Sequence, residues 1–368
     1  MKQNEIIKIY GTNYKEMTKQ LLERANLAAE IPSADLRIGI KPNLVTPTPA
    51  DYGATTHPEV AAGIVEYLQE HGFFRIVVLE GAWVGDKTSE AFEYCGYRTL
   101  SEQYGVELWD TQKDSSHVQD CAGVKLHICD MVDAIDFLIN VPVLKGHCQT
   151  RITCALKNSK GLIPNSEKRR FHTMGLHKPI AHLGVGIRQD FIVVDHICGD
   201  LDFEEGGNPV VRDCIMAAKD PVLVDAYVCH LLHYSVADVP YVGMAEELGV
   251  GSADLKTAQI FCIGPDQEGE IESRRKVVAV EDAVEAVDSC SACYASLIPA
   301  LDRLREEGLL EQLDEKIAIG QGYRGQHGRL GVGLCTAGFD VCVKGCPPTE
   351  EQVYEELKSY IRRGEEGI

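Results

Sequence analysis

The sequence predicts an α/β protein, with a mostly parallel, doubly wound sheet and a smaller, cysteine-rich module at the C-terminal end. Short apolar runs alternate with segments of helical periodicity from residue 36 to residue 263, which is typical of a parallel sheet with crossover helices. Five of the fourteen cysteines then crowd the last fifth of the chain. A length of 368 residues suits one large domain and one smaller domain, which we place at residues 1–275 and 276–368.

The first βαβ unit is predicted over residues 36–79. Residues 36–40 form a short apolar run that ends at Lys41-Pro42-Asn43-Leu44, where the proline stops regular strand pairing. Thr56-His57-Pro58 suits the start of a helix, because proline is favoured in the first turn, and apolar residues then recur at helical spacing. Residues 75–79 form the next strand, which Glu80-Gly81 closes. A crossover of this kind implies that the two strands are parallel.

The same alternation continues to the end of the large domain. We expect strands over 106–109, 134–141, 191–194 and 259–263, a hairpin strand over 124–129, and helices over 89–103 and 242–248 and after Asp220-Pro221. The strand at 191–194 should end at Asp195-His196 and lead into an acidic, glycine-rich loop over 199–207.

Residues 140–172 are basic in an otherwise acidic chain. They carry seven Lys or Arg residues against the single acid Glu167, while the formal net charge of the whole chain is −20. Glycine, asparagine and proline punctuate the stretch, which favours a loop that wraps an anionic ligand over a helix face. The alternative is a solvated surface loop that happens to be basic.

Several polar residues directly follow predicted strands. In open α/β sheets ligands bind outside the carboxyl ends of the strands, so these residues should converge on one crevice. Lysine supplies a point charge and arginine a planar fork for a carboxylate or a phosphate, and asparagine can orient the ligand by neutral hydrogen bonds. The candidate substrate-binding residues are Lys41, Asn43, Glu80, Lys145, Arg151, Lys157, Asn158 and Lys160.

His147 and His172 are the candidate catalytic residues. Imidazole titrates near neutral pH, so either side chain could act as an acid or a base, with Glu80 or Asp195 fixing its tautomer. The alternative for each is a structural histidine. Cys148 and Cys154 lie in the same basic field, which favours a thiolate, but burial would act in the opposite direction.

Charge and motifs exclude several classes of function. A charge of −20 opposes binding to nucleic acid or to an anionic membrane surface. The N-terminus lacks a signal-peptide core, and no run of about 18 apolar residues is present, so we expect a cytoplasmic protein. No GxGxxG motif opens a βα unit and no GxxxxGK[ST] motif occurs, so the sequence gives no support for an NAD-binding or an ATP-binding site.

The C-terminal cysteines predict a metal centre. Cys290 and Cys293 form a CxxC pair, Cys335 follows alone, and Cys346 precedes two prolines. Iron-sulfur binding runs often end in Cys-Pro, so we expect these four cysteines to hold a 4Fe-4S cluster, with Cys342 left over. Nearby glycines would let the backbone approach the cluster closely. Zinc is the second choice, since a zinc site usually has two tight pairs, and thiols without any metal are the third.

The spacing of these cysteines is similar to the proximal-cluster motif of hydrogenase small subunits. Segments of the large domain, over roughly residues 36–260, resemble domain of unknown function family three-six-two, whose members often carry an iron-sulfur module at one end. The chain departs from the commoner members because it lacks a ferredoxin-type run of closely spaced cysteines. The matching segments are Ile40 to Leu44, Ala54 to Glu59, Glu80-Gly81, Lys145, Leu156 to Asn158, Gly161, His172, Asp195, Asp220-Pro221 and Asp225.

Together these features predict an iron-sulfur oxidoreductase that exchanges electrons with an anionic small molecule and with a redox partner protein. A non-catalytic electron carrier, or a protein with a structural cluster, is the alternative. A weaker alternative is a redox-neutral lyase or isomerase, in which the cluster acts as a Lewis acid. The substrate and the oligomeric state are not determined by the sequence.

Overall fold

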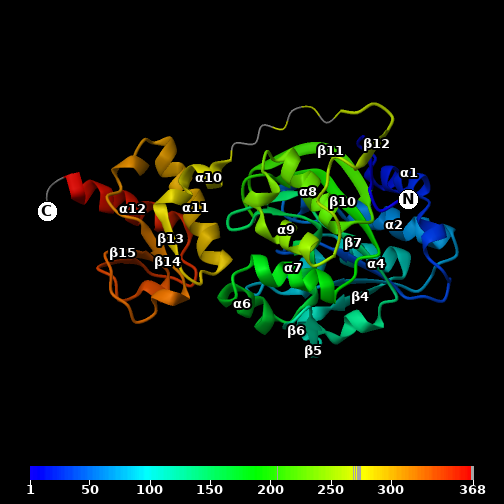
Figure 1. The fold of residues 1–368 in the computed structure, drawn as a ribbon, viewed down its shortest axis with the longest axis horizontal. Coiled ribbons are helices and arrows are strands. Elements are labelled where there is room, and N and C mark those ends of the chain that lie inside the picture. Colours follow the sequence, from blue (N-terminus) through cyan, green and yellow to red (C-terminus); the bar gives the residue numbers. More distant parts are fainter. Residues whose placement is uncertain (205, 268, 270, 272–274, 366–368) are drawn as a thin grey trace.

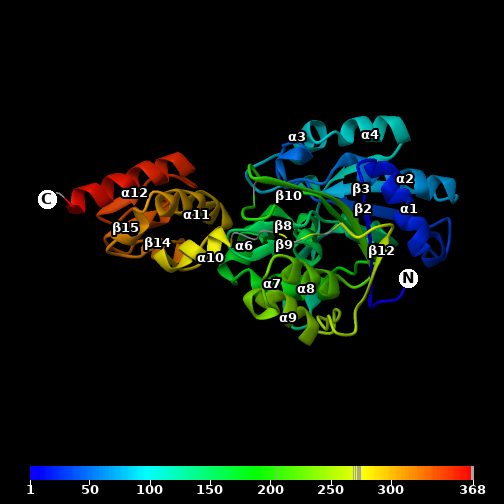
Figure 2. The same ribbon diagram turned by 90° about the horizontal axis from the view of Figure 1, so that it is seen from above.

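The structure, a computed structural model, describes residues 1–204, 206–267, 269, 271 and 275–365. Figures 1 and 2 show a larger body and a smaller body side by side along the long axis, with the N-terminus in the larger body. In this part of the chain no helix is long and apolar enough to cross a membrane.

An eight-stranded sheet organises the larger body, in the order β12-β1-β11-β10-β7-β2-β3-β4. Of the described strands of this sheet, β11 alone runs antiparallel to its neighbours, β1 and β10. The prediction of an α/β protein with a mostly parallel sheet is therefore confirmed. The strands are β1 (Glu5–Tyr10), β2 (Ile38–Pro42), β3 (Ile76–Glu80), β4 (Glu107–Asp110), β7 (Phe137–Val141), β10 (Phe191–Asp200), β11 (Pro209–Ala218) and β12 (Gln259–Ile263).

Helices cover both faces of the sheet, because strand side chains alternate between two cores. In β10, Phe191 and Val193 face one core and Ile192 and Val194 face the other. The first core is closed by α1 (Tyr14–Ala25), α2 (Pro58–Glu70), α3 (Thr88–Tyr94) and α4 (Tyr97–Tyr104). The second is closed by α5 (Ala155–Asn158), α6 (Asn165–Thr173), α7 (His177–Gly186), α8 (Pro221–Leu231) and α9 (Pro240–Glu247).

Three local predictions need correction. The single helix expected over 89–103 is two helices, because Gly96 between them adopts a φ of +80° that ends α3. Strand β10 continues past His196 to Asp200, where it still pairs with β11. Strands β1 and β11 were not expected, although β11 pairs with both β1 and β10.

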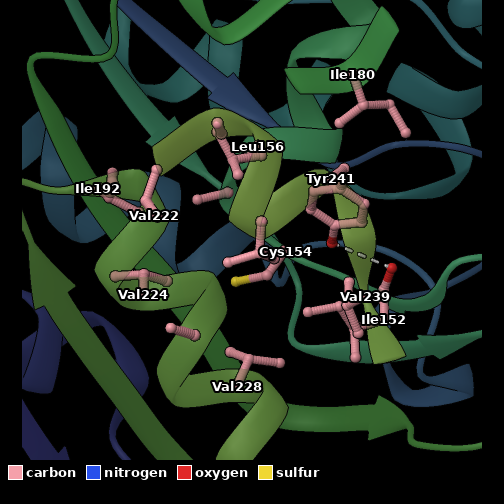
Figure 3. Close-up of a cluster of buried hydrophobic side chains, with 14 of the residues drawn as sticks. Ile152, Cys154, Leu156, Ile180, Ile192, Val222, Val224, Val228, Val239 and Tyr241 are labelled. Atoms are coloured by element: carbon pink, nitrogen blue, oxygen red, sulfur yellow. Dashed lines mark hydrogen bonds between the residues drawn. The ribbon is translucent and has the colours of Figure 1, made fainter. Parts of the chain in front are cut away.

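The basic stretch 140–172 is not an irregular loop, contrary to our expectation. It folds into the hairpin β8 (Lys145–His147) and β9 (Arg151–Thr153), then α5, a short 3-10 helix (Ser159–Leu162) and α6. Figure 3 shows why: Ile152, Cys154 and Leu156 point into a core shared with α8 and α9, where Tyr241 donates a hydrogen bond to the carbonyl of Ile152. Alternate apolar residues thus anchor the stretch, and its basic residues lie on the other side.

The smaller body is a four-stranded parallel sheet packed against helices. The strands lie in the order β13 (Val284–Ala286), β14 (Ile317–Ile319), β15 (Leu330–Val332), β16 (Val341–Val343). The helices are α10 (Lys276–Val280), α11 (Ser291–Glu306) and α12 (Glu350–Glu365). Cys148 and Phe203 of the larger body are buried in the apolar core of this smaller body, so the two bodies pack on each other.

Candidate active site

One cavity of about 780 Å³ is lined by residues of both bodies. Of the described residues that line it, eight are Lys or Arg and two are Glu, so the cavity is positive in a protein whose formal charge is −20. The predicted site residues that line it are Lys41, Asn43, Glu80, Lys145, Lys157, Asn158, Lys160 and His172 from the larger body, and Cys290, Cys293, Cys335 and Cys346 from the smaller.

A buried ion pair forms the floor of the cavity. Strands β2 and β3 are parallel neighbours, which places Lys41 and Glu80 side by side, with Nζ 2.8 Å from Oε2. The Glu80 carboxylate also accepts hydrogen bonds from the backbone N–H groups of Leu44, at 2.8 Å, and Gly81, at 2.7 Å. Burial lowers the pKa of Lys41 against the opposing attraction of Glu80. These three contacts hold Glu80 in place at the floor of the cavity.

Gly161 covers this ion pair and leaves no room for a side chain. A Cβ atom at this position would stand 1.9 Å from Glu80 Oε1 and 2.7 Å from Lys41 Nζ. The glycine therefore lets the backbone of the basic stretch approach the carboxyl ends of β2 and β3 closely.

Asn158 fixes helix α5 to the same floor. Its Nδ2 donates to Asn140 Oδ1 at 2.7 Å and to the Lys41 carbonyl at 3.2 Å. Asp225 of α8 accepts the first N–H groups of α5, from Ala155 at 2.7 Å and Leu156 at 3.2 Å. These contacts orient the helix that carries Lys157.

Glu204 is the second acid of the cavity, and it gathers three of the predicted residues. Its backbone carbonyl accepts a hydrogen bond from Lys145 Nζ at 2.8 Å, and its Oε1 accepts one from Lys157 Nζ at 3.3 Å. Burial acts to raise the pKa of Glu204, but contact with His147 and with the Lys157 ammonium lowers it well below its ordinary value. The charges of Lys157 and Glu204 therefore offset one another.

His147 lies behind the cavity wall and does not line the cavity. Its Nδ1 accepts hydrogen bonds from the N–H groups of Gln149, at 2.9 Å, and Thr150, at 3.0 Å. The ring proton therefore resides on Nε2, which lies 2.9 Å from Glu204 Oε2. Burial lowers the pKa of His147 to about 4, so the ring is neutral at pH 7. His147 acts on the cavity only through Glu204.

Of the predicted cavity residues in the larger body, His172 and Lys160 have the fewest hydrogen-bond and ion-pair partners within the described part of the chain. The Nδ1 atom of His172 is buried without a hydrogen-bond partner among the described residues. Burial, together with the nearby Lys160 ammonium, lowers the pKa of His172 to about 3. Of the two histidines proposed as catalytic, His172 alone reaches the cavity.

Arg151 is not brought to the cavity. Its φ of 69° places it at the start of β9, where its guanidinium pairs with Glu281 of the smaller body. This ion pair joins the two bodies outside the cavity lining. A charged side chain in the basic stretch can thus serve the contact between the bodies.

A second buried pair supports the segment that follows β2. The His57 backbone N–H and ring Nδ1 both contact Asp195 Oδ2, at 2.7 and 2.8 Å. Burial acts to lower the pKa of His57, but the Asp195 carboxylate outweighs burial and the pKa is raised. Neither residue lines the cavity, so this pair supports the wall.

Four of the five C-terminal cysteines form a group at the cavity. Cys290, Cys293, Cys335 and Cys346 all line it. Burial, followed by the charges of the other three cysteines, raises the pKa of Cys293 to about 12. The fifth cysteine is engaged elsewhere, since its Sγ donates to the Gly333 carbonyl and contacts Thr336 Oγ1, both at 3.5 Å. Cys342 does not line the cavity.

Polar donors and a glycine surround the sulfurs. Gln321 Nε2 donates to Cys290 Sγ at 3.6 Å, and a hydrogen bond to Cys335 raises the pKa of Arg324. Gly333 has a φ of +91°, and a Cβ atom there would lie 3.2 Å from Cys293 Sγ. As the side chains stand, no group of three or more His, Cys, Asp or Glu among the described residues could hold a metal ion.

Sequence reasoning missed several residues that line the cavity, among them Glu204, Lys168 and Arg324. Lys168 Nζ donates to the carbonyls of Gly81 and Ala82, at 2.9 and 2.8 Å, and burial lowers its pKa to about 8. Glu204 belongs to the acidic loop after β10, and the position of that loop at the carboxyl end of a strand was the available signal. Nothing in the sequence marked Arg324.

Comparison with known proteins places the large body in a family. The model of "Domain of unknown function (DUF362)" matches residues 38–230, which is more than half of the chain. A thylakoid-associated protein of Synechocystis sp. is 24% identical over 232 residues, which are 58% of this chain and 68% of that protein.

A solved structure, the lactate racemase apoprotein from Thermoanaerobacterium thermosaccharolyticum, is similar with a TM-score of 0.40 and 13% identity. The match covers 61% of this chain and 56% of the racemase, so this chain spans little more than half of that protein. The likeness is too slight to carry an argument about chemistry.

Proposed function

We propose that this chain, which belongs to the DUF362 family of domains of unknown function, is an iron-sulfur oxidoreductase. It would transfer electrons to or from an anionic small molecule bound at the carboxyl ends of the sheet strands. The observation that carries the proposal is the shared cavity: four cysteines of the smaller body and the basic residues of the larger body line the same space of about 780 Å³.

The donor set is suited to a 4Fe-4S cluster. Such a cluster takes four thiolates, each of which binds a different iron, and its potential depends on charges and hydrogen bonds at the sulfurs. Cys290, Cys293, Cys335 and Cys346 supply the thiolates, while Gln321 and Arg324 stand at two of the sulfurs. Gly333 leaves the space beside Cys293 free of a side chain. When bound, the cluster would supply or accept one electron at a time.

The basic residues bind and orient the substrate in this proposal. Lys160 and Arg169 are the basic cavity residues for which no hydrogen bond or ion pair is found among the described residues. Arg169 is therefore free to pair with a carboxylate or a phosphate, and Lys160 is free to contact the same ligand. Lys41, Lys145 and Lys157 already have protein partners and contribute a positive field. The field favours an anion over a neutral molecule of the same shape.

Apolar residues exclude water from one wall of the cavity. Ala82, Trp83 and Val84 follow directly after β3 and line the cavity, and the Trp83 ring lies over Gly85. A drier site strengthens the interaction between an anion and the lysines. His172 holds a neutral imidazole at the same cavity, where it is placed to hydrogen-bond the substrate.

Metal analysis of protein purified without oxygen tests this proposal. We expect about four iron and four sulfide per chain, and an EPR signal after reduction with dithionite. The Cys335→Ser variant should lose the iron, and the matched Cys342→Ser variant should keep it, because Cys342 is hydrogen-bonded away from the group. A colourless wild-type protein that contains stoichiometric zinc would contradict the proposal.

Ligand binding separates an enzyme from an electron carrier. A screen of small carboxylates and phosphates should raise the melting temperature of the wild-type protein, since a ligand stabilises by RT ln(1 + [L]/Kd). Arg169→Gln should weaken the shift, and Arg98→Gln, a change at an exposed position of α4 outside the cavity, should not. If no anion shifts the melting temperature and the cluster is present, the protein is an electron carrier.

A further inference from the structure

Lys160 is an amine that faces the cavity without a partner. It lies in the 3-10 helix between α5 and α6 and is half-buried. No hydrogen bond or ion pair of its Nζ is found among the described residues. The neighbouring lysines differ in this respect: Lys157 Nζ contacts Thr153 and Glu204, and Lys168 Nζ contacts two backbone carbonyls. Polar contacts thus oppose the effect of burial on the two neighbouring ammonium groups, whereas Lys160 Nζ has no such contact among the described residues.

The surroundings of Lys160 favour a neutral amine. The charged groups that face it are Lys157 from α5, Lys168 from α6 and Glu204 from the loop after β10, so two cations stand against one carboxylate. Burial, and then the Lys157 charge, lowers the pKa of Lys160 to about 7. A desolvated lysine beside other cations is the usual form of a nucleophilic amine.

We propose that Lys160 forms a covalent imine with an anionic aldehyde or ketone bound in the cavity. The Nζ lone pair attacks the carbonyl carbon, a C–N bond forms, and the carbonyl oxygen leaves as water after two protons have moved to it. One proton comes from the attacking nitrogen and the other from the medium, so the net change is loss of one water and gain of one positive charge. No oxidant or reductant is needed.

His172 and Arg169 complete the chemistry. His172 lines the same cavity, interacts electrostatically with Lys160, and carries a buried Nδ1 without a partner among the described residues. Its neutral ring can pass the proton between Nζ and the departing oxygen. Arg169 is exposed at the cavity and offers a planar fork to the carboxylate or phosphate of the same molecule. The ligand class is thus a carbonyl compound that bears an anionic group.

This inference does not rest on the iron-sulfur proposal. Imine formation needs only the amine, the cations and the histidine, all of which belong to the larger body. A protein that lacked iron could still form the imine, and a protein that held a cluster could fail to form it. The two proposals therefore fail separately.

Trapping by reduction tests the inference. The full chain is incubated without oxygen at pH 7 with glyoxylate, pyruvate or glycolaldehyde phosphate and with sodium cyanoborohydride, and acetaldehyde is the neutral control. Intact mass and peptide mapping then locate the adduct. We expect one adduct, on Lys160, with at least one of the anionic compounds, and much less with acetaldehyde. At pH 7 the neutral fraction of an exposed lysine is on the order of 1,000-fold smaller than that of Lys160.

Variants and pH supply the controls. Lys160→Arg should abolish the adduct, while Lys178→Arg, at an exposed lysine of α7, should leave it unchanged. The initial rate of labelling of the wild type should fall about tenfold from pH 8 to pH 6, because attack requires the neutral amine and the pKa of Lys160 is about 7. The peptide map of the wild type is decisive even if a variant misfolds: adducts spread evenly over exposed lysines, or absent with all three anions, overturn the inference.

Discussion

Glu80→Gln isolates the electrostatic role of the floor of the cavity. The change keeps the size of the side chain but removes the negative charge 2.8 Å from the buried Lys41 Nζ. Breaking a buried ion pair by removing one partner costs about 3–5 kcal/mol. The amide also has one acceptor fewer for the N–H groups of Leu44 and Gly81, and an unsatisfied buried donor costs about 1–3 kcal/mol of that total.

The pH dependence of this cost has a definite sign. Burial already lowers the pKa of Lys41, and without Glu80 the attraction that opposes burial is gone. In the variant, the folded protein then binds fewer protons than the unfolded chain between the two pKa values of Lys41. The wild type behaves likewise at a higher folded pKa, so the deficit of Glu80→Gln shrinks as pH rises between the two folded pKa values and should not be larger at pH 9 than at pH 6. The hydrogen-bond part of the deficit should not change with pH.

Thermal melts at pH 6, 7.5 and 9 provide the assay, with equal metal content in each sample. For a body of this size 1 kcal/mol shifts the melting temperature by about 2–4 °C, so a fall of roughly 6–20 °C is expected at pH 6. Glu66→Gln is the control, because Glu66 pairs with Lys15 and Lys19 near the surface and should cost less than about 1 kcal/mol. An unchanged melting temperature at pH 6, or a deficit that grows with pH, would refute the reasoning.

Three further outcomes are expected. Metal analysis should show that Gly333→Ala lowers the iron content at least twofold and that Gly325→Ala does not. Both glycines have a positive φ, but only at Gly333 would a Cβ atom contact a cysteine sulfur. Asp195→Asn should lower the melting temperature more at pH 6 than at pH 8. In the wild type, the pKa of His57 is raised in the folded state, and the stability that this adds is fully present below the unfolded pKa, near 6.5. The added stability is lost as pH rises through the folded pKa. Phe203→Ala should cost about 3–5 kcal/mol of contact between the bodies and speed hydrogen exchange in α11, whereas Phe74→Ala, at a side chain 70% exposed, should do neither.

The strands and helices that sequence predicts best are those with a strong apolar pattern. Strands β2 and β3 are five buried residues each, and α2 follows a proline in its first turn, so local signals sufficed. Strand β11 begins with exposed and half-buried residues and was missed. It forms because it pairs with β1 and β10, and its own composition does not predict a strand.

For the site, the sequence indicated residues that line one cavity, but not which of them already have hydrogen-bond or ion-pair partners within the protein. Lys41, Glu80 and Lys145, which each follow a predicted strand, line one cavity. The partners of these residues lie far along the chain, as Glu204 does for Lys157, and local patterns carry no information on such contacts. The same limit applies in part to His147: Glu204 is distant in sequence, whereas the two backbone N–H groups that bind its ring belong to the nearby Gln149 and Thr150.

Two adjacent residues, Phe203 and Glu204, have different roles at the contact between the bodies. Phe203 is buried in the core of the smaller body, and the next residue, Glu204, accepts Lys145 and balances Lys157 in the larger one. A chain divided at the boundary between the bodies would expose Phe203 and release the residue that holds two buried lysines. The larger body is therefore a poor choice for study as an isolated fragment, and exchanging the smaller body between relatives requires the loop that carries Phe203 and Glu204 to be exchanged with it.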